Sequence, residues 1–528
     1  MLESGSKRAT AVLVILAAAF IAILPAVFYG IPFSRDLYHH FRLALAFFDS
    51  ARQGDLYPGW LAQANGSFGE VSPRFYPPGL SYLLLICRLL LGNWYVSALF
   101  GFFVLTFIGG VGAYFWARSF MARDSAMWAG VLYIFTPYHL NELYQSSLLA
   151  EYAAASILPF AFGFTERICR GGGRRDVAGL AASYAALVLT HTPLTLIGSY
   201  ALLPYALISL MSSNPKLVHR TVARLTAGVG LALVASACFW GTVVAELQWL
   251  RPDIEPENVF SWRMFLFSSF DQRANSIWYG NLLAAATLFM AVPALIRPHS
   301  KKLWALFAGS LVMSTLISYP LWQVMPLLKS VQVPWRWLAV TSMAAAILAA
   351  ESITRWKEMA RSASRPLAML AAGCVAGAVV FGIAHPVREA HYLSREQFEA
   401  VLQNLELPSI GAWYPRWVAP QYLNMSQLVL AEGRSVKINA WETERRQFHI
   451  SAGGVREARV RTFYYPLWTA VAEGKSLNIS PAPDGAMIIS IPEEEATVDL
   501  VFQEPLRSKV SMILSAIGFF AIAVAAVV

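Results

Sequence analysis

The chain has 528 residues, of which 57% are hydrophobic and only 14% are charged. Soluble domains usually carry about 25% charged residues, so this composition indicates an integral membrane protein and excludes a large soluble enzyme. The formal net charge of +9 does not indicate nucleic-acid binding, because the basic residues stand in short clusters between apolar runs.

The apolar runs recur along most of the chain, and many are roughly 17 to 22 residues long, enough to cross a hydrocarbon core about 30 Å thick. They predict about twelve transmembrane helices, the first of which is a retained anchor because no small-residue cleavage site follows it. The expected spans are 10–29, 94–116, 125–139, 147–165, 177–191, 193–211, 223–245, 281–296, 303–318, 336–351, 367–384 and 508–527.

Lysine and arginine set the predicted orientation, because they accumulate in cytoplasmic loops. If the N-terminus is cytoplasmic, the following basic residues all fall on the cytoplasmic side: Arg118, Arg123, Arg167, Arg170, Arg174, Arg175, Lys216, Arg220, Arg297, Lys301, Lys302, Arg355, Lys357, Arg361 and Arg365. The agreement requires that the apolar stretch 79–91 does not cross. Its shortness and its Arg88 favour a helix at the outer surface.

The outer face then holds a long first loop, at about 30–93, and a domain at 385–507. Short runs of β-branched or alternating residues, separated by Pro and Gly turns, predict a small antiparallel β-sandwich in this domain. The expected strands are 437–441, 447–451, 458–464, 486–491 and 497–502. The expected organisation is a transmembrane domain at 1–384 that includes the first loop, the mostly β domain at 385–507, and a C-terminal helix at 508–528.

The first outer loop opens with a dense group of ionisable residues directly after the first span: Arg35, Asp36, His39, His40 and Arg42. Such residues at the end of a membrane helix are costly and suggest a function. Asp36 and His40 are spaced i, i+4, which suits a base with an orienting partner or two metal ligands. An equally good interpretation is that the cations snorkel at the interface and Asp36 caps the next helix.

Two aromatic and proline-rich segments follow in the same loop, and they contain Tyr57, Trp60, Arg74 and Tyr76. Stiff aromatic segments beside a membrane suit a groove that grips a sugar face or a lipid headgroup, and they suit simple interface anchoring equally well.

Further polar residues come from later parts of the chain. Glu151 is expected inside the outer part of a span and Glu142 at its mouth, as a site or as a helix cap with a buried pair. His191 ends the fifth expected span on the same side. Trp335 and Arg336 begin a helix on the outer face, where the cation suits a phosphate or cation–π packing. The predicted topology brings all of these residues to one face of the membrane.

The acidic SRDLYHH motif, followed by GDLYPGW and FYPPGLSYLL, resembles the GT-C superfamily of polytopic glycosyltransferases. That superfamily includes oligosaccharyltransferase, protein O-mannosyltransferase and the lipid A aminoarabinose transferase. More narrowly, these motifs together with YHLNELYQSSLLAEYAA, LTHTPLT, VPWRWL, AWYPRWVAPQYL and YYPLWTAVAEGK resemble bacterial membrane proteins labelled 6-pyruvoyl-tetrahydropterin-synthase-related and, more distantly, the YfhO-like proteins.

The resemblance implies a GT-C-like fold and makes Asp36 the catalytic acidic residue of the first outer loop. It implies that Glu142, Glu151 and His40 form the second acidic, acceptor or metal position, and that Arg336 or Arg74 holds the donor phosphate. Arg35, His39, Tyr57, Trp60, Tyr76, His191 and Trp335 would support the site. The first loop lacks a clear Asp-x-Asp or Asp-Glu pair, so a requirement for Mg²⁺ or Mn²⁺ stays open, and no other cofactor is implied.

We therefore expect a glycosyltransferase of the bacterial inner membrane that uses a polyprenyl-phosphate-linked sugar on the outer face. The acceptor would be a glycan, a lipid or a protein. Two alternatives stay open: a transporter or flippase of lipid-linked sugars, and a non-catalytic assembly protein of the cell envelope. The alternative of transport predicts ionisable residues near the membrane midplane, whereas here they gather at one face.

Overall fold

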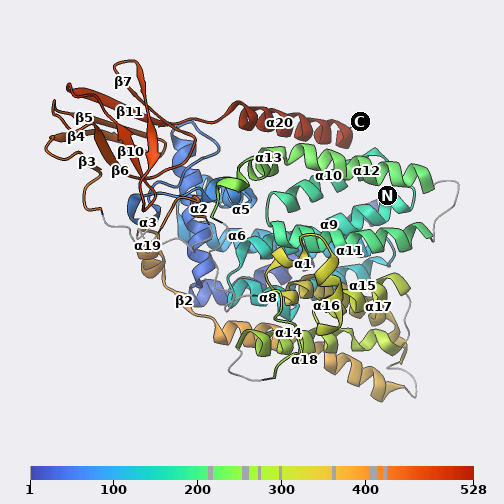
Figure 1. The fold of residues 1–528 in the computed structure, drawn as a ribbon. Helices are drawn as coiled ribbons and strands as arrows, with labels where there is room; N and C mark the ends of the chain where they lie inside the picture. The colour runs from blue at the N-terminus through green and yellow to red at the C-terminus, as the bar shows by residue number, and fades with distance from the viewer. Residues whose placement is uncertain are drawn as a thin grey trace.

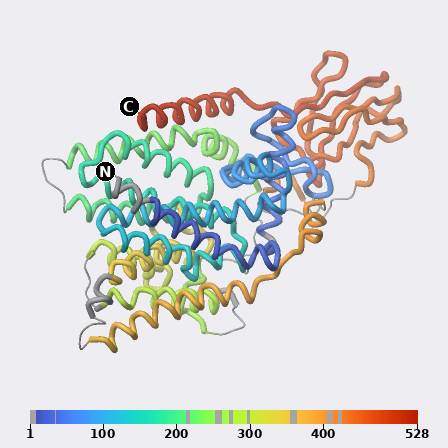
Figure 2. The backbone as a smooth tube through the Cα atoms, turned by 180° about the vertical axis from the view of Figure 1, so that it is seen from behind, coloured from blue at the N-terminus to red at the C-terminus, as the bar shows by residue number. Residues whose placement is uncertain are grey.

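The structure is a computed structural model that describes residues 2–211, 218–251, 261–270, 275–296, 300–359, 364–403, 413–419 and 425–527. It consists of a body of roughly parallel helices with a β domain at one end (Figure 1). Views from two opposite sides show both chain termini at the other end of the helical body (Figures 1 and 2). The predicted class, a helical protein with a β domain near its C-terminus, is confirmed.

The helical body contains α1 (Leu2–Tyr29), α6 (Trp94–Ala117), α7 (Arg123–Ile134), α8 (Pro137–Tyr144), α9 (Leu149–Cys169), α10 (Arg174–Val188), α11 (Thr192–Met211), α12 (Val218–Ala235), α13 (Ala237–Glu246), η2 (Leu247–Trp249), α14 (Asn275–Ala291), η3 (Val292–Ile296), α15 (Lys301–Met313), η4 (Leu316–Ser318), α16 (Tyr319–Val324), η5 (Leu328–Val331), η6 (Pro334–Trp337), α17 (Leu338–Met359), α18 (Arg365–Glu389) and α20 (Leu506–Val527).

The expectation of about twelve spans is not confirmed. Among the described residues, seven helices are long and apolar enough to cross a membrane, or eight if α12 and α13, bent by 69° at their junction, form one span. Each of the other expected spans does contain a helix. However, α9, with 21 residues, is long enough but not apolar enough to be a candidate span, and α7, α10 and α15 have only 12, 15 and 13 residues. Helices of this length reach about 18–23 Å, less than a core of about 30 Å.

The first outer loop folds into short elements that lie at the end of the helical body next to the β domain (Figure 1). These are β1 (Ile31–Pro32), α2 (Arg35–Arg52), α3 (Ala64–Ser67), α4 (Ser72–Phe75) and α5 (Gly79–Leu91). With 13 residues, α5 is about 20 Å long and is not among the candidate spans, so our prediction that it does not cross stands as a prediction.

A two-stranded ladder fixes the point where the chain leaves α1. Ile31 and Pro32 pair with Leu393 and Tyr392 of β2 (Tyr392–Leu393), which follows α18 and precedes α19 (Arg395–Gln403). Gly30, just before β1, has φ +113° and lies so close to the Leu393 carbonyl that any Cβ would collide with it. Glycine is required at this position for both reasons.

Replacing Gly30 with alanine should therefore destabilise the start of the first outer loop. We expect a loss of about 2 kcal/mol in the free energy of unfolding, from an unfavourable φ and a backbone collision. Thermal unfolding in detergent would measure it. Gly54→Ala is the control, because Gly54 also has positive φ but has open space around its Cα. An equal loss in both variants would contradict the role of the collision.

The β domain has two antiparallel sheets. One has the order β3–β6–β10–β9 and the other the order β4–β5–β11–β7–β8. The strands are β3 (Val429–Leu430), β4 (Val436–Trp441), β5 (Arg445–Ile450), β6 (Glu457–Phe463), β7 (Trp468–Ala472), β8 (Lys475–Leu477), β9 (Ile479–Pro481), β10 (Ala486–Ser490) and β11 (Ala496–Phe502). All five strands that the sequence predicts are present, and alternate residues of both sheets share one core, as in a sandwich.

The first outer loop completes the core of the β domain. Trp60, Phe68, Val71 and Phe75 are buried there among the strand residues. The ring of Trp60, for example, lies 5.6 Å from that of Trp468 on β7. The expected domain at 385–507 therefore leaves out side chains on which its own core depends.

Glu444, in the turn between β4 and β5, accepts a hydrogen bond from the backbone N–H of Gly59 and so ties the β domain to the first outer loop. Burial raises the pKa of the Glu444 carboxyl from 4.5 to about 7. A raised pKa in the folded state gives stability that is complete below about pH 4.5 and is lost as the pH rises through about 7.

Glu444→Gln should remove this loss, because glutamine can accept the same bond without ionising. We expect the variant to exceed the wild type by about 1–3 kcal/mol in stability at pH 8 and to match it at pH 4. Thermal unfolding followed by tryptophan fluorescence at both pH values would show the difference. If the Glu444→Gln variant were more stable than the wild type by the same amount at pH 4, the raised pKa of Glu444 could not be the cause.

Candidate active site

The beginning of α2 is held against the turn between α8 and α9. The Ser34 hydroxyl donates to the Ser146 carbonyl at 2.6 Å, and the Ser147 hydroxyl donates to the Pro32 carbonyl at 3.2 Å. Ser34 is also the N-cap of α2, accepting from the N–H of Asp36. The expectation that Asp36 itself caps this helix is therefore wrong. Asp36 lies in the first turn, with its side chain partly exposed.

The two predicted glutamates lie on the other side of this contact, and both are buried. Glu151, near the start of α9, accepts a hydrogen bond from the Tyr138 hydroxyl at 2.7 Å. Glu142, near the end of α8, accepts one from the Asn141 side-chain amide at 2.9 Å through Oε1, while its Oε2 has no partner among the described residues. Of these three acidic residues, Asp36 is the one that is not buried.

Arg336 lies in the same place and forms an ion pair with Glu151, with 2.8 Å between Nε and Oε2. Its Nη1 donates to the Val331 carbonyl at 2.6 Å and to the Gln332 side chain at 2.8 Å. Its remaining nitrogen, Nη2, makes no hydrogen bond to a described residue. The side chain is 10% exposed, so one edge of a fixed guanidinium is left for an anion.

Two histidines and a tyrosine of the first outer loop line the same region. The ring centroids of His39 and His40 lie 5.0 and 5.7 Å from that of Tyr76. Burial lowers the pKa of His40 to about 3, and burial followed by the charges of His40 and Arg42 lowers that of His39. Both imidazoles are therefore neutral near pH 7, and neither ring nitrogen of His39 has a partner among the described residues.

Electrostatic interactions show that these groups form one cluster, which we call the outer acidic cluster: Asp36, His40, Tyr76, Tyr138, Glu142, Glu151, His191 and Arg336. Glu142 lies on α8, outside the candidate spans. Burial, and then the charge of Glu151, raise the pKa of Glu142 far above its usual value.

Arg74 lies away from the outer acidic cluster. Its guanidinium is buried and binds both oxygens of Glu246 on α13, each at 2.7 Å, and it also pairs with Glu504 after β11. Two carboxylates occupy this cation, which joins the first loop to α13 and to the β domain. We therefore do not include Arg74 in the site proposed below.

The remaining predicted residues divide between the core and the edge of the cluster. Trp60 fills the core of the β domain, and Tyr57 packs against Phe47 of α2 with 5.6 Å between ring centroids. Trp335 is partly buried beside Arg336 and packs on the core of the helical body. The side chain of Arg35 lies outside the described part of the structure.

The sequence interpretation missed Tyr138 and Asn141, which bind the two glutamates, and Gln332, which binds Arg336. The first two stand in the same segment as Glu142, in PYHLNELY. Their signal was a run of polar side chains that the structure buries completely at the end of a helix. Such residues are expected to hydrogen-bond to one another.

A divalent metal does not fit the residues present. Within the described ranges, no three His, Cys, Asp or Glu side chains come together as a metal site would require. The carboxylate oxygens of Glu151 are both committed, to Tyr138 and to Arg336. We therefore derive no chemical step through a metal.

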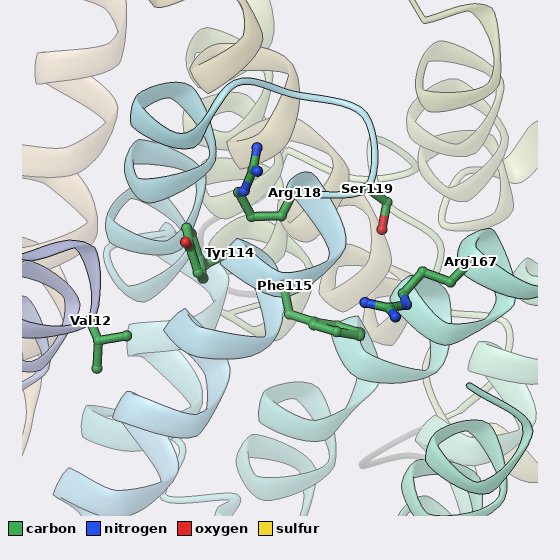
Figure 3. Close-up of a pocket in the computed structure, with 6 residues that line it drawn as sticks. All are labelled: Val12, Tyr114, Phe115, Arg118, Ser119 and Arg167. Carbon is green, nitrogen blue, oxygen red and sulfur yellow. The ribbon is translucent and has the colours of Figure 1, made fainter. Parts of the chain in front are cut away.

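A cavity at one end of α6 and α9 contains none of the predicted site residues. It has a volume of about 440 Å³ and is lined by Val12, Tyr114, Phe115, Arg118, Ser119 and Arg167 (Figure 3). Arg167 pairs with Asp176 at 2.5 Å and lies over the Phe115 ring, and Arg118 donates to the Met121 carbonyl. Both cations are thus satisfied within the protein.

Several solved structures are similar to this chain. A structure of the arabinofuranosyltransferase AftD from Mycobacteria aligns with a TM-score of 0.48 and 18% identity over 71% of this chain. The archaeal oligosaccharyltransferase AglB from Archaeoglobus fulgidus, in complex with an inhibitory peptide and a dolichol-phosphate, aligns with a TM-score of 0.44 and 11% identity over 78%. ArnT from Cupriavidus metallidurans, bound to undecaprenyl phosphate, aligns with a TM-score of 0.43 and 13% identity over 72% of this chain. The chain spans 26%, 61% and 77% of these three proteins.

No protein of curated function matches the chain by sequence. A family model does match, described as a 6-pyruvoyl-tetrahydropterin synthase related domain of a membrane protein, over residues 73–385. This range is more than half of the chain, and it includes Glu142, Glu151, His191 and Arg336. The chain therefore belongs to the family of 6-pyruvoyl-tetrahydropterin synthase related membrane proteins.

Proposed function

We propose that the protein is a membrane glycosyltransferase that moves a sugar from a polyprenyl-phosphate-linked donor to an acceptor on the outer face. The observation that carries the proposal is the arrangement of the outer acidic cluster. A reachable carboxylate, Asp36, stands near a buried, immobilised arginine, Arg336, at the ends of membrane helices.

The proposed chemistry uses groups of this chain alone. Asp36 takes the proton of an acceptor hydroxyl or amine as that group attacks the anomeric carbon of the donor. The bond from this carbon to the lipid phosphate breaks, and the free edge of Arg336 stabilises the negative charge that develops on the phosphate. Because the acceptor attacks from the side opposite the phosphate, the configuration at the anomeric carbon is inverted.

Glu151 and Tyr138 would act as positioning residues. Glu151 binds Arg336 through one oxygen and Tyr138 through the other, so the guanidinium is held before the substrate arrives. Such prior ordering is what makes a charged group effective in stabilising a transition state.

The grouping of basic residues supports an outer location for this cluster. The β domain lies at the same end of the helical body as α2 and α8, and the chain termini lie at the other end (Figures 1 and 2). Arg118 lines one cavity together with Val12 of α1, and Arg170 and Lys302 both pair with Glu166 of α9. Of the predicted cytoplasmic residues, Lys216, Arg297 and Arg361 lie outside the described ranges. We propose the bacterial inner membrane, with the site facing outward.

The test is transfer of a radiolabelled sugar by the purified protein from a panel of polyprenyl-phosphate donors to extracted cell-envelope acceptors, with and without a chelator. We expect transfer from at least one donor, unaffected by the chelator. Absence of transfer from every donor would contradict the proposal. If a chelator abolished the transfer, the metal-free mechanism would be contradicted, but the proposed glycosyltransferase activity would not.

A further inference from the structure

A polar cavity of about 880 Å³ lies between α2 and the turn of the β4–β5 hairpin. This volume is within the range of about 300–1,000 Å³ that small ligands occupy. One stripe of α2 lines it, with residues 42, 45, 46, 49, 52 and 53 recurring at helical spacing, and Trp441 and Glu442 line the opposite wall. Asp36 lies on a different side of α2, about 20 Å along the helix from Asp49.

The walls of this cavity are fixed by buried polar contacts. Arg42 pairs with Glu70 at 2.5 Å, and both side chains are almost completely buried. Three consecutive residues at its edge, Asn65 to Ser67, have φ of 55°, 62° and 68°. Left-handed conformations of non-glycine residues are costly and are often found at functional sites. The segment is held by hydrogen bonds from Asn65 to Gly69 and from the Tyr414 hydroxyl to Asn65.

The side chains that face the cavity keep their hydrogen-bonding capacity. Asp49, Gln53, Gln63 and Ser67 make no side-chain hydrogen bond to any residue that the structure describes, although they carry amide, carboxylate and hydroxyl groups. Together they offer both donors and acceptors, which suits a ligand rich in hydroxyl groups.

The charges that line the cavity nearly cancel. Glu70 neutralises Arg42, which leaves Arg52 against Asp49 and Glu442, a small excess of negative charge. Such a lining does not attract an anionic ligand. Trp441 adds a partly exposed aromatic face, whose other interaction is with the Arg446 guanidinium, 4.8 Å from the ring centroid. An aromatic face beside neutral hydrogen-bonding groups is suited to the ring of an uncharged sugar.

We propose that this cavity, which we call the α2–β4 cavity, binds a neutral oligosaccharide as a remote part of the acceptor. The claim that this oligosaccharide is the acceptor rests on the proposed function. The claim that the cavity binds the oligosaccharide does not. An acceptor that reaches both the cavity and Asp36 must extend over about 20 Å and pass around α2. The acceptor class is therefore a glycan of several units, in preference to a lipid or a peptide.

The first experiment measures binding without any donor. Full-length protein in nanodiscs is titrated with neutral hexose and pentose oligosaccharides of one to eight units, and tryptophan fluorescence reports binding because the partly exposed Trp441 lines the cavity. A uronic-acid oligosaccharide and an unstructured neutral peptide serve as comparison ligands. We expect affinity to rise with the length of a neutral glycan and to be absent for both comparison ligands.

Two variants probe the cavity in different ways. Ala46→Trp fills it, and the available volume is large enough that the new ring need not disturb α2. Gln53→Ala/Gln63→Ala removes two exposed amides without adding bulk. The loss of two hydrogen bonds should weaken binding about tenfold. Gln503→Ala, an exposed glutamine after β11 that does not line the cavity, is the matched control and should bind as the wild type does.

The second experiment separates this inference from the proposed function. With long acceptors, both cavity variants should raise the KM for the acceptor about tenfold and leave kcat unchanged, whereas with a one-unit acceptor they should behave as the wild type. Glycan binding without transfer from any donor would overturn the proposed function and retain the cavity as a glycan site. Transfer with no effect of either variant on binding or KM would overturn the inference, as would binding of the peptide in place of the glycans.

Discussion

Asp36→Asn is expected to lower the rate of sugar transfer by about 10²–10⁴-fold while the protein remains folded. Asparagine has nearly the same shape, and the N–H of residue 36 still donates to the Ser34 hydroxyl. The amide, however, cannot take a proton from the acceptor. Initial rates with saturating donor would measure the effect, and circular dichroism and thermal unfolding would confirm the fold.

Asp55→Asn provides the matched control for this prediction. Asp55 lies in the same outer loop beyond the end of α2, where it accepts hydrogen bonds from the Ser50 hydroxyl and the N–H of Tyr57. Asparagine can accept the bond from the Tyr57 N–H through its oxygen, and its amide group can donate to the Ser50 hydroxyl oxygen, so we expect a rate close to that of the wild type. A folded Asp36→Asn protein with wild-type activity would remove Asp36 from the mechanism.

Replacing either partner of the Arg336–Glu151 ion pair should lower both stability and sugar transfer, and this is the second large effect that we expect. Glu151→Gln leaves the arginine buried at 8% exposure without its counter-charge, and Arg336→Met does the same to the glutamate. Removing one partner of a buried ion pair typically costs about 3–5 kcal/mol. We expect a loss of this size in thermal unfolding, together with loss of transfer.

The double variant Glu151→Gln/Arg336→Met separates stability from chemistry. The double variant buries no unpaired charge, and its glutamine can still accept a hydrogen bond from the Tyr138 hydroxyl. Most of the stability lost in the single variants should therefore return. Transfer should not return, because no cation remains to stabilise the leaving phosphate. A stable double variant that transfers sugar at the wild-type rate would show that the pair is only structural.

The five predicted strands and the helix that begins at the SRDLYHH motif could be read from the sequence, because alternation and turn residues are local signals. The number of membrane spans could not be predicted from the sequence. Apolar composition extends through α7, α10 and α15, but polar residues or proline follow each of them and the helices are short. Composition thus indicated membrane character, whereas helix length excludes these three segments and polar content excludes α9 from the candidate spans.

Contacts between distant parts of the chain could not be predicted from the sequence either. Arg74 suited a phosphate as well as any other cation until the structure placed Glu246, 172 residues away, on its guanidinium. Trp60 suited a sugar platform, yet the β domain encloses it. By contrast, Asp36, Glu142, Glu151, His191 and Arg336 were expected on one face from topology, and the structure brings them within electrostatic interaction of one another. Their roles in transfer remain our proposal.

The most direct test of the central claim uses sealed proteoliposomes that carry a radiolabelled donor in both leaflets and an acceptor only outside. Released lipid phosphate, glycosylated acceptor and donor in each leaflet are measured together. The proposed reaction predicts one lipid phosphate released for each sugar transferred, and no change in the inner donor pool beyond spontaneous exchange. Movement of intact donor between leaflets without phosphate release would contradict it and would identify the protein as a transporter of lipid-linked sugars.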